Sequence, residues 1–80
     1  MDIMAIRLRT LREKMGMSQA KLAKEIGVTQ ASVNRYETAR VTPPAEVLLF
    51  YADRFDVSLD YIYGLSLIHI SEPTRRVVIS

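Results

Sequence analysis

Cysteine is absent from the sequence, and glycine, proline and histidine are scarce, with three, three and one residues respectively. Without cysteine the chain can form neither disulfides nor thiolate metal sites, which fits a reducing compartment. The single histidine, His69, has no metal-binding partner at helical spacing, so we expect neither a metal ion nor a cofactor. No apolar run approaches the roughly 18 residues of a membrane span, and the N-terminus lacks the apolar core of a signal peptide. These absences predict a cytoplasmic protein.

The residues that are present suffice for one small domain with one core, since the chain has 80 residues and 49% of them are hydrophobic. The net charge of +2 is unevenly distributed. Residues 1–40 carry eight basic and four acidic side chains, a balance of +4, whereas residues 41–64 carry one basic and four acidic side chains, a balance of −3. The first part therefore suits a polyanion such as nucleic acid, although charge clusters of this size are usually solvated helix faces.

Apolar spacing and capping residues predict five short helices, at about residues 3–15, 19–26, 30–38, 43–55 and 59–63. The predicted N-caps are Ser18, Thr29 and Ser58, and the predicted stops are Gly16, Gly27 and Gly64. The positions expected to face the core are Met4, Leu8, Leu11, Met15, Leu22, Ala23, Ile26, Val28, Val33, Tyr36, Val47, Leu48, Tyr51, Ala52 and Phe55. The fold class is therefore all-α.

The most informative segment is QAKLAKEIGVTQASVNRYET, which begins at Gln19 and ends at Thr38. It predicts two helices joined by a turn of about three residues. Ala23 is small enough for the helices to approach closely, and Gly27 allows the positive φ of a sharp exit from the first of them. The apolar positions leave a polar face on the second helix that the major groove of DNA can admit. The residues left outside are Lys21, Lys24, Gln30, Ala31, Asn34 and Arg35.

On these residues the chain resembles the Cro/CI-type, or XRE-like, helix-turn-helix regulators, which include the lambdoid phage repressors. The likeness covers about residues 4–64, including SQAKLAKEIGVTQASVNRYE and the closing FDVSLDYIYG. It implies a five-helix, lambda-repressor-like DNA-binding domain at residues 1–64, with the helix-turn-helix at its second and third helices. The implied function is sequence-specific binding of double-stranded DNA through the major groove, by a prokaryotic transcriptional regulator that acts as a repressor and is nucleoid-associated when bound.

The resemblance also implies roles for single residues. The expected base contacts are Thr29, Gln30, Ala31, Asn34 and Arg35, and the expected phosphate contacts are Gln19, Lys21, Ser32, Thr38, Arg40 and Thr42. Ser32 and Asn34 match positions that touch either bases or backbone, and Gln19 also braces the recognition helix. Chemistry adds that Gln30 can pair with adenine and Arg35 with guanine, while a phosphate contact competes for Arg35.

An ion pair is expected between Arg12 and Glu37, which match a family pair that ties the first helix to the end of the third. Independently, Arg12 shares the buried side of its helix with Leu8 and Leu11, where an unpaired guanidinium would be costly. Arg12 is therefore predicted to be structural rather than a DNA contact.

Other functions remain open at this point. The chain could be an antitoxin-like protein-interaction module, and Tyr51, Tyr61 and Tyr63 could stack on single strands, although their acidic surroundings favour core or dimer packing. An enzyme is not expected, because the sequence has no Cys/His pair and no phosphate-cradling glycine loop. The expected partner is double-stranded DNA, bound by a homodimer on a two-fold operator.

Residues 65–80 differ in character from the rest, with the sequence LSLIHISEPTRRVVIS. Polar and apolar residues alternate around a break at residues 72–74, which could give a β arm at a dimer interface. The string SLIHISEPTR also resembles a translated sequencing-adapter read-through. In that case the natural chain was cut near Leu65, and a further effector domain or protein-binding segment is missing from this sequence.

Overall fold

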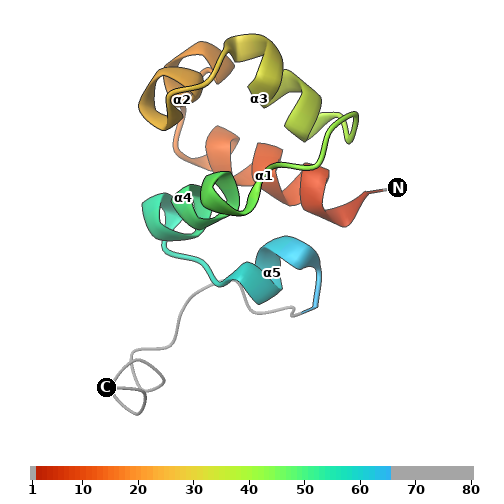
Figure 1. Cartoon of the computed structure of the whole chain (residues 1–80). Coiled ribbons are helices and arrows are strands. Elements are labelled where there is room, and N and C mark those ends of the chain that lie inside the picture. The colour runs from red at the N-terminus through yellow and green to blue at the C-terminus, as the bar shows by residue number, and fades with distance from the viewer. Residues whose placement is uncertain (1, 66–80) are drawn as a thin grey trace.

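The computed structural model describes residues 2–65, which fold into five helices (Figure 1). These are α1 (Ile3–Lys14), α2 (Gln19–Ile26), α3 (Gln30–Glu37), α4 (Ala45–Phe55) and α5 (Leu59–Tyr63). In Figure 1, α1 crosses the middle of the domain, with α2 and α3 on one side and α4 and α5 on the other. Residues 2–65 contain no strand, so the predicted all-α class is confirmed. None of these five helices has the length and hydropathy of a membrane span.

Capping residues define where most of the helices begin. The hydroxyls of Ser18, Thr29 and Ser58 each accept a hydrogen bond from the backbone N–H three residues later, as predicted. Asp2 caps α1 in the same way, which the sequence analysis missed. The prediction that the fourth helix begins at the prolines is wrong. Pro44 is the N-cap residue of α4, and the helix begins at Ala45.

The core joins all five helices. Its fully buried side chains include Leu8 of α1, Leu22 of α2, Val33 of α3, Tyr51 of α4 and Ile62 of α5. Burying this apolar surface is the main favourable contribution to folding. The predicted core positions Leu8, Leu22, Val33 and Tyr51 are therefore confirmed, whereas Ile62 was not predicted.

The prediction that Met15 faces the core is wrong. α1 ends at Lys14, and Met15 follows it with 53% of its surface exposed. The chain then turns at Gly16, where φ is +67°, and the buried methionine is Met17 at 6% exposure. Helical spacing assigns a face only while the helix continues, which it does not do here.

The end of α5 packs against the start of α1. Gly64 has a φ of +84°, and a Cβ atom at this position would lie 2.8 Å from Cγ2 of Ile3. Glycine is therefore required both by the backbone conformation and by the close contact. Leu65 is the last described residue, and both predictions for the segment that follows it lie outside the described residues.

Candidate nucleic-acid interface

The turn between α2 and α3 has the sharp geometry that the sequence predicts. Gly27 has a φ of +92°, and a Cβ atom there would meet nothing within 4 Å, so the backbone conformation alone favours glycine. The N–H groups of Gly27 and Val28 both donate to the carbonyl oxygen of Ala23, at 2.8 and 3.0 Å. Ala23 itself is 3% exposed. The turn is therefore closed by backbone hydrogen bonds and needs a small side chain beneath it.

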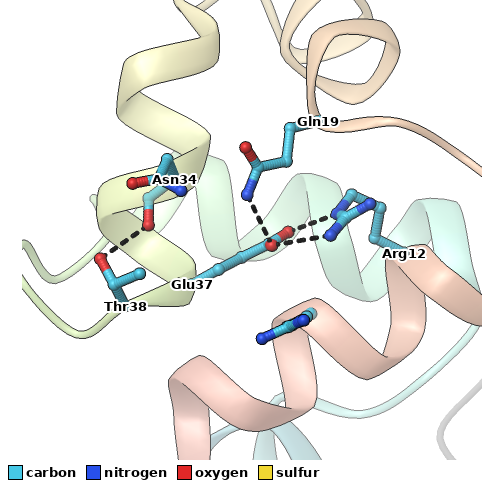
Figure 2. Close-up of a pocket in the computed structure, with 6 residues that line it drawn as sticks. Arg12, Gln19, Asn34, Glu37 and Thr38 are labelled. Atoms are coloured by element: carbon cyan, nitrogen blue, oxygen red, sulfur yellow. Dashed lines mark hydrogen bonds and ion pairs between the residues drawn. The ribbon is translucent and has the colours of Figure 1, made fainter.

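An ion pair between Arg12 of α1 and Glu37 at the end of α3 fixes the position of α3 (Figure 2). Nε of Arg12 lies 2.7 Å from Oε2 of Glu37, and Nη2 lies 3.0 Å from Oε1. The side chains of Arg12 and Glu37 are 11% and 2% exposed, respectively. Such a two-point contact restrains orientation as well as distance, because both groups are planar.

Two further hydrogen bonds complete this arrangement. Nη1 of Arg12 donates to the carbonyl oxygen of Met17 at 2.7 Å, and Nε2 of Gln19 donates to Oε1 of Glu37 at 3.1 Å. The hydrogen bonds to Glu37 raise the pKa of Arg12 further, against the opposing effect of burial. We call Arg12, Gln19 and Glu37 the brace, because together they connect α1, the start of α2 and the end of α3 (Figure 2).

The outward side of α3 presents the residues predicted to meet bases. Gln30, Ala31 and Arg35 are all exposed, and we call these three residues the reading face. Thr29 is exposed too, but its hydroxyl accepts from the backbone N–H of Ser32 and lies 3.0 Å from the Ser32 hydroxyl. The Thr29 hydroxyl therefore caps the helix, and the Ser32 hydroxyl is its hydrogen-bond partner.

The residues predicted to touch phosphates surround the reading face. Lys21, Arg40 and Thr42 are exposed, and Thr38 donates its hydroxyl to the carbonyl oxygen of Asn34 at 2.8 Å. The loop after α3 turns back because the N–H of Arg40 donates to the carbonyl oxygen of Arg35 at 3.0 Å. Ala39 makes this turn with a φ of +63°, which is unusual for a residue with a side chain.

Asn34 is exposed on the same side of α3 as Gln30 and Ala31, since it follows them by four and three residues. It lines a surface pocket of about 180 Å³ together with the brace residues, Thr38 and Arg9 (Figure 2). Asn34 is a predicted base contact, whereas Arg9 has no predicted role. A signal for Arg9 was present, since it is a basic residue three positions before Arg12 and therefore near it on α1.

Arg7 is held by α5 rather than turned toward α3. Its guanidinium carbon lies 4.2 Å from the centroid of the Tyr61 ring, and Nη1 donates to the carbonyl oxygen of Tyr61. The Tyr51 hydroxyl is buried and has no hydrogen-bond partner among the described residues. A buried Tyr51 and an arginine-covered Tyr61 do not form the stacking platform that the sequence analysis considered.

Comparisons with known proteins agree with this geometry. A helix-turn-helix family model matches residues 8–62. The HTH-type transcriptional regulator YobD of Bacillus subtilis is 40% identical over 60 residues, which are 75% of this chain and 54% of that protein. The cryptic phage CTXphi repressor RstR of Vibrio cholerae is 34% identical over 58 residues, 72% of this chain and 52% of the repressor. The chain thus spans about half the length of these two relatives.

A similar solved structure is that of the P22 c2 repressor in complex with a synthetic operator. It matches with a TM-score of 0.74 at 29% identity, over 82% of this chain and 100% of that chain. The solution structure of the DNA-binding domain of the same repressor gives a TM-score of 0.69 at 30% identity, over 88% and 95%. The five-helix, repressor-like fold is therefore confirmed, and these similar proteins are regulators and repressors rather than enzymes.

Proposed function

This chain belongs to the helix-turn-helix family of XRE-type regulators, and on that premise we propose that it binds operator DNA sequence-specifically and represses transcription. The observation that carries the proposal is the exposed reading face on a helix whose end is fixed by the buried brace. An α3 of eight residues is about 12 Å long and fits the major groove. The similar P22 c2 repressor was solved with a synthetic operator, which supports the same ligand class here.

In this proposal Gln30 and Arg35 are the main base-reading side chains. They are five residues apart on α3, about 7.5 Å along the axis, so they would meet different base pairs. Ala31 would offer its methyl group to thymine, and Thr29, whose hydroxyl caps α3, would offer its methyl group as well. The phosphate contacts would be Lys21, Ser32, Arg40, Thr42, Thr38 and the amide of Gln19.

We further propose that two copies act together on a two-fold operator. One α3 can contact only a few base pairs, whereas two copies one helical turn of DNA apart, about 34 Å, would specify a longer site. The matched region is about half the length of two relatives. We therefore also propose that a further effector or protein-binding domain belongs to the natural protein. An antitoxin-like interaction module finds no support among the named relatives, which are called regulators or repressors. Because operator DNA is the ligand, the cytoplasm is the proposed location.

The test is selection of bound sites from random duplexes, followed by affinity measurements on single variants. Gln30→Ala should relax the choice at one base pair, with a loss of about 1–3 kcal/mol on the selected site. Lys21→Ala should weaken selected and random duplexes alike, because phosphates carry no sequence information. The outcome for Arg35→Ala decides between its base and phosphate roles.

The wild-type chain should also lose affinity steeply with salt. If each copy neutralises roughly four to six phosphates, log K against log salt should fall with a slope of about −4 to −5. A flat dependence, or equal affinity for single strands, would contradict docking in the groove. If Gln30→Ala weakens selected and random duplexes equally, α3 does not read bases through that residue.

A further inference from the structure

We propose that the pocket beside α3 is a seat for a DNA backbone phosphate, and that Arg9 is its cationic ligand, exchanging Glu13 for the phosphate when DNA binds. The inference deepens the proposed function and rests on it. It concerns a residue outside the predicted site and a pocket formed by α1, α2 and α3 together.

The pocket has a suitable size and lining for one phosphate group. Its volume is about 180 Å³, and it is lined by Arg9, Arg12, Gln19, Asn34, Glu37 and Thr38. All six side chains are polar, and four of them come from α2 or from α3 and its C-cap. Figure 2 shows Asn34 and Thr38 on one side and the brace on the other. A polar hollow at the edge of the reading face is where the DNA backbone passes when α3 enters the groove.

The charges that line the pocket favour an anion. The Glu37 carboxylate is the only acidic group among the lining residues, and it already accepts three hydrogen bonds from Arg12 and Gln19. Its charge is balanced by Arg12, so the second cation of the lining, Arg9, is paired only with Glu13, which does not line the pocket. The amide groups of Gln19 and Asn34 add neutral donors, since an amide nitrogen carries two protons.

Arg9 is held weakly enough to change partner. Its Nε lies 3.1 Å from Oε2 of Glu13, and the two side chains are 63% and 54% exposed. Exposed pairs of this kind contribute little, because water already screens both charges. By contrast, the guanidinium of Arg12 is fixed by Glu37 and Met17, and that of Arg7 by Tyr61. Among the arginines of α1, Arg9 is therefore the one suited to a phosphate.

The same geometry gives Asn34 a backbone role. Its side chain lines the pocket, whereas Gln30 and Arg35 do not. Asn34→Ala should then weaken selected and random duplexes by the same factor. Relaxed choice at a single base pair would overturn this assignment and return Asn34 to base contact.

The main experiment compares the salt dependence of duplex binding for the wild-type chain, Arg9→Ala and Lys14→Ala. Lys14→Ala is a matched control, because it removes one positive charge from the same helix. Lys14 lies about 140° from Arg9 around the axis of α1. Arg9→Ala should reduce the log–log slope by about 0.9, which corresponds to about an eightfold loss at 0.1 M salt. The loss should be equal on selected and random duplexes, while Lys14→Ala should leave the slope nearly unchanged.

A second comparison separates the binding of a phosphate by Arg9 from the ion pair between Arg9 and Glu13. In a Glu13→Gln chain, Arg9→Ala should cost at least the same factor, because Arg9 then has no carboxylate to leave. Equal slopes for Arg9→Ala and Lys14→Ala, or no loss in the Glu13→Gln background, would overturn the phosphate seat. If the wild-type chain itself shows no salt-dependent duplex binding, the proposed function fails as well, so the two failures are distinguishable. The melting temperature of Arg9→Ala should fall by no more than about 2–4 °C, which separates lost binding from lost folding.

Discussion

Replacing Arg12 by alanine should destabilise the domain more than replacing either of the arginines in the more exposed ion pairs, Arg9 and Arg54. The change removes two hydrogen bonds to Glu37 and one to the carbonyl oxygen of Met17. It leaves the Glu37 carboxylate, which is 2% exposed, with the Gln19 amide as its remaining donor among the described residues. Breaking a fully buried ion pair costs about 3–5 kcal/mol. Because this pair borders an open pocket, water can reach the orphaned carboxylate, and we expect about 2–4 kcal/mol.

The assay is urea and thermal unfolding of single and double variants. For a domain of this size, 1 kcal/mol shifts the melting temperature by roughly 4–8 °C, so Arg12→Ala should lower it by roughly 8–30 °C. Glu37→Ala should cost a similar amount, and the double variant less than the sum of the singles. Arg9→Ala is the control within the same helix, since its exposed pair should contribute only about 0.5 kcal/mol or less. Additive losses of a few tenths of a kcal/mol for Arg12 and Glu37 would refute the reasoning.

Three smaller predictions concern Tyr51, Ala39 and the segment after Leu65. Burial, and then the charge of Glu37, raises the pKa of the Tyr51 hydroxyl, so stability should be complete below pH 10, the usual tyrosine value, and fall by up to about 1.4 kcal/mol per pH unit above it. Urea unfolding of Tyr51→Phe should show a shallower fall, and identical pH slopes would contradict a buried hydroxyl. Ala39→Gly should stabilise the domain by about 0.5–1 kcal/mol because φ is +63°, whereas Ala20→Gly inside α2 should destabilise it by a similar amount. A chain ending at Leu65 should keep its melting temperature and half-site binding, and loss of either would make the later residues a working element.

The helices could be predicted because their signals are local. Ser18 and Thr29 cap helices through bonds that span three residues, and Gly27 turns the chain by its own backbone preference. The error at Met15 arose at a helix end, where periodicity no longer assigns a face. Local patterns therefore predict which helices form, but they predict the last residues of those helices less accurately.

The candidate site was predictable only where the resemblance supplied a partner. The contact between Arg12 and Glu37 joins residues 25 positions apart, and no local pattern pairs them. The ion pair between Arg54 and Glu25, at 3.0 Å and 29 positions apart, was not predicted for the same reason. The pocket that includes Arg9 depends on how three helices meet, which the sequence does not specify without the fold.

The contact between Ile3 and Gly64 brings the two ends of the described domain together. It places the last described turn beside the start of α1, on the side of the domain away from α2 and α3 (Figure 1). The matched region makes up 54% of one relative and 28% of another, so the same module is found in proteins of different lengths. Because the start of the first helix and the last described turn are in contact, residues 2–65 close on themselves as one unit.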